Sequence, residues 1–184
     1  MNGANRDKVE KNSIILRPLR VTDLWSVHRM RDSLSQESKR FFPSRIWGFR
    51  SISWYLVLAQ GALIISCNAF TRRLLRRVYA KASFFTIVAV DTHKSNNRVI
   101  GVGYLRGTTI WREFYLGGIC VHDSYQELGV GSNLMEELIS YARGKGAQRI
   151  ILGVQRDNVK AISLYKKYGF KPASYPTMIL EELT

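Results

Sequence analysis

The sequence predicts a single α/β (α+β) domain whose mixed, mostly antiparallel central sheet is flanked by helices. Strands and helices alternate along the chain, two β-rich segments form a hairpin, and a strand followed by a glycine turn leads into an amphipathic helix. A chain of 184 residues, 46% hydrophobic and 23% charged, can bury one core. We expect residues 1–12, which are polar and charged, to form a flexible tail and residues 13–184 to form the domain.

The strands are predicted from runs rich in β-branched and aromatic residues that end at proline, glycine or polar turns. They are expected at 13–19, 83–90, 99–106, 113–121, 149–154 and 175–180, with Phe170 in a further short strand. An Asn- and Ser-rich turn separates 83–90 from 99–106, so these two strands should pair as a hairpin.

The helices are predicted from apolar residues at helical spacing, bounded by capping residues and by glycine or proline. They are expected from a cap at Thr22 and Asp23 to Met30, and at 35–40, 132–143 and 158–167. A longer helical segment is expected between the first helix and the second strand.

Positive charge is concentrated in the first part of the chain. The formal net charge is +14; residues 1–110 carry 19 Lys and Arg against 6 Asp and Glu, while residues 111–184 carry 9 against 8. Such a field favours anionic partners, such as nucleotide phosphates, and disfavours a polycationic substrate.

The two cysteines give no sign of a disulfide or metal site. Cys67 and Cys120 have neither a CxxC spacing nor a neighbouring histidine cluster. We therefore expect no disulfide framework, no bound metal and a cytoplasmic location.

Gly129 and Gly131 lie between the strand at 113–121 and the helix at 132–143. Unpaired N–H groups at the start of that helix attract an anion, and glycine removes the Cβ atoms that would hold a phosphate away. Glycine can equally serve only to bend the chain, and the spacing is too short for the longer dinucleotide or P-loop fingerprints. The residues alone leave both interpretations open.

The neighbouring sequence narrows this choice. Residues 126–131, QELGVG, have the Q/R-x-x-G-x-G/A pattern and follow the strand segment GGICVHDSY. Downstream, VQRDNVKAISLYKKYGFK combines an asparagine with a helix that ends in Tyr-x-x-x-Gly-Phe. Together these motifs resemble the GNAT superfamily of acetyl-CoA-dependent N-acetyltransferases. The resemblance covers residues 100–180 well, the N-terminal strand and helix moderately, and residues 45–81 hardly at all.

The resemblance implies a GNAT-like fold, acetyl-CoA as co-substrate and specific roles for the motif residues. The loop backbone would hold the pyrophosphate of coenzyme A, with Gln126 shaping the turn, and the preceding strand would present backbone groups to the acetyl carbonyl and the pantetheine arm. The implied cofactor-binding residues are Ile119, Val121, Gln126, Leu128, Gly129, Val130, Gly131, Ser132 and Asn158. Tyr165 matches the catalytic residue that protonates the leaving thiolate. Glu127 departs from relatives that carry a basic residue beside the phosphates.

Two of these residues also have structural interpretations. Tyr165 lies among apolar residues spaced for helix packing, so it can be read as a core aromatic. Asn158 precedes a helix and can be read as its cap.

The base that deprotonates the substrate ammonium is less clear. Glu113 and Tyr115 should share a strand face with Gly117 and Ile119, because alternate residues of a strand point the same way. This makes Glu113 a candidate catalytic base. An ordinary exposed carboxylate at this position, with a water-mediated route for the proton, fits the sequence as well.

Residues 51–71 carry no charge, and Arg72, Arg73, Arg76 and Arg77 follow on one helical face. The run could just span a bilayer by length, but it contains polar residues and would divide the domain, so we favour a buried or groove-lining helix over membrane contact. The arginine face is either simply solvated or suited to an anionic membrane surface, an acidic partner or an acidic acyl acceptor.

The sequence therefore predicts an acyltransferase, a GNAT-type N-acetyltransferase that moves an acetyl group from acetyl-CoA to a primary amine by direct attack. A peptide N-terminus, a lysine or an amino-containing small molecule, acidic ones included, would each serve as acceptor, and nucleic acid is not favoured. The alternative is a non-catalytic coenzyme-A-binding protein whose basic half engages an anionic membrane or nucleic acid. The sequence does not indicate an oligomeric state.

Overall fold

The computed structural model describes residues 13–41, 82–93, 98–108, 112–174, 176–181 and 183. Within these ranges the strands are β1 (Ile14–Pro18), β2 (Ala82–Asp91), β3 (Arg98–Thr108), β4 (Glu113–Val121), β5 (Arg149–Gly153), β6 (Lys171–Pro172) and β7 (Thr177–Glu181). The helices are α1 (Leu24–Asp32), α2 (Gln36–Phe41), α6 (Val130–Gly144) and α7 (Val159–Lys167), with short 3-10 turns η2 (Val21–Asp23) and η3 (Asp123–Tyr125). The longer helical segment expected before the second strand, the arginine face and the N-terminal tail lie outside the described residues.

The strands form one sheet in the order β1-β2-β3-β4-β5-β7-β6. Each neighbouring pair is antiparallel except β4 and β5, which run parallel. The predicted hairpin is β2 and β3, paired from Ala82 opposite Thr108 to Asp91 opposite Arg98. The predicted mixed, mostly antiparallel sheet is thereby confirmed.

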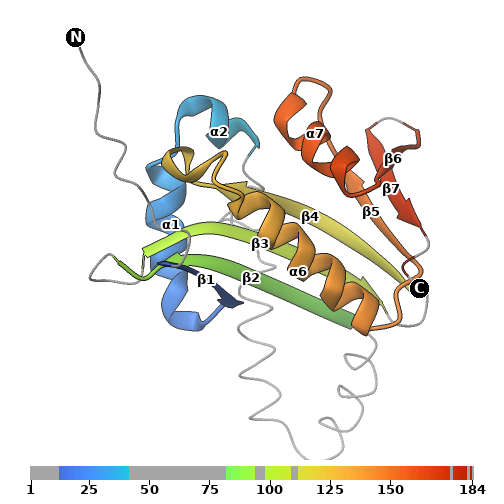
Figure 1. Ribbon diagram of the computed structural model, residues 1–184, viewed down its shortest axis with the longest axis horizontal. Helices are drawn as coiled ribbons and strands as arrows, with labels where there is room; N and C mark the ends of the chain where they lie inside the picture. The colour runs from blue at the N-terminus through green and yellow to red at the C-terminus, as the bar shows by residue number, and fades with distance from the viewer. Residues whose placement is uncertain are drawn as a thin grey trace, which may run out of the picture.

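Helices cover the two faces of this sheet (Figure 1). On one face α6 packs with Leu134 and Leu138 against inward side chains of β2 to β4, such as Leu105. On the opposite face α1 places Val27 and Met30 against a second buried cluster, whose strand members are Val88, Val90, Val99, Val102 and Cys120. The sheet is therefore the middle layer of three.

The start of α1 differs from the expected cap. Asp23 occupies the N-cap position, but its side chain makes no capping bond to the helix. Instead its two carboxylate oxygens accept hydrogen bonds of 2.6 and 2.7 Å from Arg17, and one also accepts from the N–H of Arg20 at 2.7 Å. The prediction that Asp23 caps the helix is wrong, because a guanidinium on β1 competes for the carboxylate. The ion pair fixes α1 to the edge of the sheet instead.

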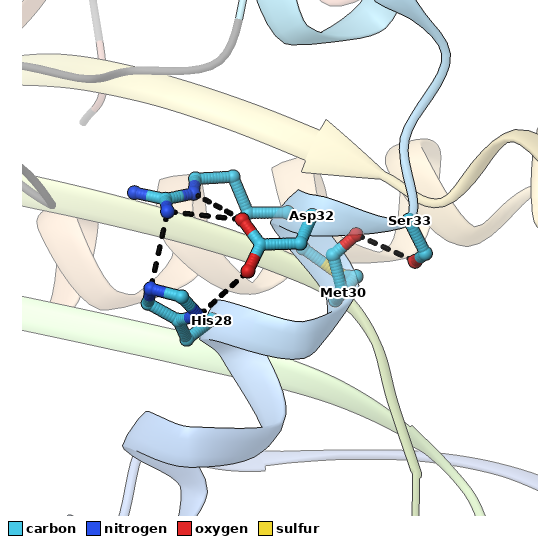
Figure 2. A network of polar contacts seen from close by, with 5 residues as sticks. His28, Met30, Asp32 and Ser33 are labelled. Carbon is cyan, nitrogen blue, oxygen red and sulfur yellow. Dashed lines mark hydrogen bonds and ion pairs between the residues drawn. The ribbon is translucent and has the colours of Figure 1, made fainter.

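The last turn of α1 carries a polar network on its outer side (Figure 2). Asp32 pairs with Nδ1 of His28 at 2.9 Å and with Arg31 at 2.9 Å, and Arg31 also approaches Nε2 of His28 at 3.1 Å. The ring of His28 thus lies between the carboxylate of Asp32 on its Nδ1 side and the guanidinium of Arg31 on its Nε2 side. The hydroxyl of Ser33 donates to the carbonyl of Met30 at 2.8 Å and helps to end the helix.

Replacing Asp23 by asparagine should lower the free energy of unfolding by about 1.5 kcal/mol at neutral pH, the scale of losing charge-assisted hydrogen bonds. Hydrogen bonding to Arg17, and then to the N–H of Arg20, holds the pKa of Asp23 below its ordinary value. A depressed pKa contributes stability above the unfolded value of about 3.9, and this is lost as the pH falls through the folded pKa. Urea unfolding at several pH values should therefore give a difference that shrinks in acid.

Asp32→Asn is the matched control, since its carboxylate lies exposed on the same helix, and it should change stability much less. An Asp23→Asn deficit as large at pH 3 as at pH 7 would contradict this explanation.

Among the described residues no helix is long and apolar enough to cross a membrane. The uncharged segment at 51–71 lies outside these residues. Within the same described ranges, no cluster of three His, Cys, Asp or Glu side chains is placed to hold a metal ion.

Candidate active site

A β-bulge interrupts β4 at Gly117. Leu116 pairs with Leu105 on β3, but Gly118 pairs with the adjacent Tyr104, so Gly117 is an extra residue without its own partner. Gly118 has a φ of +153°, a conformation that favours glycine. A Cβ atom on Gly117 would collide with the ring of Tyr104. Two consecutive glycines therefore make the bulge possible.

After the bulge, the side chains of β4 point to the opposite faces of the sheet from those that the two-residue alternation would give. Before it, Phe114 and Leu116 point into the core under α6; after it, Ile119 and Val121 do so. Glu113 and Tyr115 therefore lie on the opposite face from Ile119. The prediction that these residues share one face is wrong, because an extra residue in a strand shifts the two-residue alternation by one.

Beyond the bulge, β4 loses its partner on one side. The parallel pairing of β4 with β5 runs from Glu113 opposite Arg149 to Leu116 opposite Leu152 and ends there. Figure 1 shows the two strands diverging toward the end of the sheet where α2 and α7 lie. The N–H of His122 donates to Ile100 on β3 at 2.8 Å. Because backbone groups alternate in direction along a strand, those of Val121 and Ile119 point away from β3, toward the space between the diverging strands.

The turn after β4 leads directly into α6 at the same end of the sheet. Gly129 is the N-cap with a φ of +85°, which favours glycine, and the first helical hydrogen bond runs from Asn133 to the Gly129 carbonyl at 3.0 Å. The N–H groups of Val130, Gly131 and Ser132 therefore have no partner within the helix. The predicted start of this helix at Ser132 is two residues late. Leu128, the preceding loop residue, is 40% exposed.

Gln126 holds this turn together. Its amide nitrogen approaches the carbonyl of Val121 at 3.3 Å and a carboxylate oxygen of Asp123 at 3.1 Å. Asp123 in turn accepts from the N–H of Ser35 at 2.7 Å and from the hydroxyl of Ser38, at the start of α2. The loop is thus fixed to both β4 and α2, and a role of Gln126 at a cofactor site stays a prediction.

Two lysines of α7 reach the glycine loop, and sequence reasoning missed them. Lys160 donates to the side-chain oxygen of Gln126 at 3.2 Å, and Lys167 donates to the hydroxyl of Ser132 at 3.3 Å. Their seven-residue spacing places them on one side of a helix, but only the packing of α7 beside α6 brings them to the loop. They supply the positive charge that Glu127, exposed and with a φ of +66°, does not.

Three tyrosine side chains approach one another near the bulge. Tyr165 on α7 is 6% exposed and packs against Phe170 at 5.8 Å between ring centroids. Burial raises the pKa of Tyr165 to about 12, and Tyr115 adds to this effect. Burial likewise raises the pKa of Tyr104 to about 12, with further contributions from both other tyrosines. Tyr165 is thus a core aromatic, and the effect of Tyr115 on its pKa indicates that the two side chains lie near each other.

Asn158 and Glu113 both have local partners. Asn158 is the N-cap of α7, where its side-chain oxygen accepts from the N–H of Ala161 at 3.2 Å. Glu113 forms an ion pair with Arg149, directly opposite it on β5. Glu113 also lies four residues before Gly117, about 13 Å along an extended strand. These contacts give Glu113 a structural role away from the bulge.

Comparison with known proteins bears on the site. Residues 68–170 match the Acetyltransferase (GNAT) family. The L-amino acid N-acetyltransferase AaaT of Escherichia coli (strain K12) is 46% identical over 55 residues, which are 29% of this chain and 34% of that protein. The ribosomal protein bS18-alanine N-acetyltransferase of the same strain is 37% identical over 70 residues, 35% of this chain and 47% of that protein. The chain thus spans less than half of the length of either relative.

The fold has solved counterparts. The spermidine N-acetyltransferase from Vibrio cholerae, solved in complex with CoA and spermine, superposes with a TM-score of 0.64 at 18% identity, covering 94% of this chain and 97% of that one. The likeness concerns the fold, including the arrangement of sheet and helices. The family match spans more than half of the 184 residues. The chain belongs to the acetyltransferase (GNAT) family.

Proposed function

We propose that this protein transfers an acetyl group from acetyl-CoA to a primary amine by direct attack. The observation that supports the proposal is a juxtaposition: unpaired N–H groups at the start of α6 and the part of β4 beyond Leu116, which no longer pairs with β5, lie at the same end of the sheet as α7, the helix that carries Tyr165 (Figure 1). An anion site, a backbone donor and a proton donor are the three elements that acetyl transfer from a thioester needs.

Coenzyme A would bind along β4 and the start of α6. The N–H groups from Leu128 to Ser132 would hold the pyrophosphate, with the helix dipole adding attraction. Ile119 and Val121 would offer backbone groups to the pantetheine arm and the acetyl carbonyl. The capping bond of Asn158 uses only its side-chain oxygen, so its NH₂ group can still donate to pantetheine.

The reaction then needs no covalent protein intermediate. The neutral amine nitrogen attacks the thioester carbonyl, a C–N bond forms as the C–S bond breaks, and the surplus amine proton leaves to water. A β4 amide near the bulge would stabilise the negative charge on the carbonyl oxygen. The products are an amide and coenzyme A with a free thiol. We assign no base to Glu113, since it is paired with Arg149.

Tyr165 would act as a hydrogen-bond donor to the departing sulfur. The pKa of its hydroxyl, about 12, is about three to four units above that of an ordinary thiol. Complete transfer of its proton to a thiolate would therefore be uphill. The hydroxyl stays protonated at neutral pH and lowers the energy of the thiolate by donating to it, while the final proton comes from the medium.

The experiment that tests this function measures thiol release from acetyl-CoA across a panel of primary amines. The panel should include amino acids, peptides with free N-termini, lysine peptides and amino sugars. Turnover on at least one acceptor, with its acetylated product found by mass spectrometry, supports the proposal. Calorimetric binding of coenzyme A without turnover on any acceptor would instead favour a non-catalytic coenzyme-binding protein.

Lys160→Ala and Lys167→Ala should each weaken coenzyme A binding by about three- to tenfold at low salt, because each removes a positive charge from the phosphate site. Both lysines are exposed, so the effect should fade in 0.5 M salt, where the Debye length shrinks to about 4 Å. Lys166→Ala, an exposed neighbour on α7, is the control and should bind normally. The measurement is calorimetric titration with coenzyme A at two salt concentrations. If all three variants bind coenzyme A as tightly as wild type, Lys160 and Lys167 do not contribute to the phosphate site.

A further inference from the structure

Arg106 lies beside the tyrosine cluster on the face of the sheet opposite α6. On β3 it is directly opposite Tyr115 of β4, and its guanidinium carbon lies 4.7 Å from the centre of the Tyr115 ring. It also stands two residues after Tyr104, on the same side of the strand. The pKa of Tyr104 is raised chiefly by burial, and the charge of Arg106 opposes that rise. Arg106 is therefore close to the hydroxyls at the bulge.

The cluster contains no carboxylate that neutralises Arg106. Glu113, the acidic side chain on the same face of β4, is paired with Arg149. Across the described ranges no carboxylate forms an ion pair with Arg106. Outside them the chain contains only three acidic residues, Asp7, Glu10 and Glu182. A positive charge thus remains exposed beside the place where acetyl transfer would occur.

This face is the side from which an acceptor would approach. The inference rests on the proposed function, in which coenzyme A enters from the side of α6 and its thioester lies between the diverging strands. The amine must then reach the carbonyl from the other side, past Tyr104, Tyr115 and Arg106. Tyr115 is 36% exposed there, and its hydroxyl is close to the backbone of Gly153 at the end of β5.

We propose that Arg106 selects acceptors that carry a carboxylate close to the amine to be acetylated. A guanidinium binds a carboxylate through two parallel N–H donors, and stacking on an aromatic ring leaves those in-plane donors free. A carboxylate on the acceptor supplies the negative charge that the cluster lacks. A second ammonium group on the acceptor would instead be repelled by Arg106, which disfavours polyamines.

The test compares matched acceptors that differ only in this charge. The first pair is L-alanine and L-alaninamide; the second is the dipeptide amides Asp-Ala and Asn-Ala, which place the carboxylate in a peptide. An amino acid and its amide differ in amine pKa, so the informative quantity is the ratio of their kcat/KM values in each variant relative to wild type. That double ratio cancels the intrinsic difference between the amines.

In Arg106→Gln the preference for the carboxylate member should fall by about 10- to 100-fold, the range of a lost charge-assisted hydrogen bond. Arg106→Lys keeps the charge without the two parallel donors, so its preference for the carboxylate member should lie between those of wild type and Arg106→Gln. Lys145→Gln removes the same charge at the far end of α6 and should leave the ratio unchanged. Whichever pair shows the loss identifies a free amino acid or a peptide as the source of the carboxylate.

Three outcomes would overturn the inference. If the ratio of kcat/KM values between matched acceptors is the same in Arg106→Gln as in wild type while turnover continues, Arg106 does not recognise the carboxylate. Turnover on spermidine or a lysine peptide but on neither carboxylate acceptor excludes an acidic substrate. Absence of thiol release from every acceptor refutes the proposed function itself, and the inference with it. Calorimetric binding of coenzyme A by each variant shows that the fold is intact.

Discussion

Replacing Gly131 by valine should weaken coenzyme A binding by about 100-fold, or about 2.7 kcal/mol. Gly131 is the second residue of α6, and its N–H, which has no partner within the helix, would face the phosphate in the proposed site. A Cβ atom there would lie 3.6 Å from Cδ2 of Leu164 and 3.8 Å from Cγ2 of Val121, which are ordinary contact distances. A Cβ atom therefore fits at this position without displacing its neighbours, and the loss should come from the side chain keeping the phosphate off the amides.

The design of this experiment separates binding from folding. Gly131→Ala is the milder variant and should bind coenzyme A with intermediate affinity. Gly144→Val lies at the other end of the same helix, where an added Cβ meets nothing within 4 Å, and should bind normally. Gly129 is unsuitable, because its φ of +85° strains any other residue. The test is calorimetric titration of folded Gly131→Val protein with coenzyme A. An unchanged affinity for coenzyme A would show that the loop is not part of the cofactor site.

Local sequence signals predicted most of the framework of the site. Strand β4 was predicted from Glu113 to Val121, the bounds that the structure has. The helix at 158–167 corresponds to α7 with Asn158 as its N-cap. Each of these elements is encoded within about ten consecutive residues, by periodicity and by capping or turn residues.

The parts that failed depend on contacts between separate elements of the fold. The bulge exists only in the register between β3 and β4, although two glycines inside a predicted strand, Gly117 and Gly118, are the signal that could have indicated it. Asp23 is predicted to cap α1, but Arg17 of the preceding strand β1 binds its carboxylate instead. Pairings of this kind are decided by tertiary packing, which a single sequence does not display.

Replacing Tyr165 by phenylalanine should lower kcat by about 100-fold while coenzyme A affinity stays nearly constant, as expected when a donor acts mainly in the transition state. The ring remains, so its packing against Phe170 is kept. Because the pKa of Tyr165 is raised to about 12, the hydroxyl is protonated throughout the neutral range. The loss should therefore be the same from about pH 6 to about pH 9.

Tyr168→Phe is the matched control on the same helix. The single proton of its hydroxyl is shared between Glu136 at 2.7 Å and the carbonyl of Ser132 at 3.2 Å, and the control should retain nearly full activity. Steady-state rates and coenzyme A titrations on both variants decide the role. A Tyr165→Phe enzyme within about threefold of the wild-type rate would mean that Tyr165 is not the sole donor to the departing thiolate.

The neighbouring hydroxyls determine how a smaller loss should be understood. Tyr104 and Tyr115 are near enough to influence the titration of the cluster, so one of them can in principle donate to the sulfur when Tyr165 is lost. In that case Tyr165→Phe alone would be mild, Tyr104→Phe or Tyr115→Phe alone would also be mild, and the double variant with Tyr165→Phe would lose far more than the product of the two effects. If Tyr165 is the sole donor, the double variants should lose no more than Tyr165→Phe multiplied by the small effect of the second change.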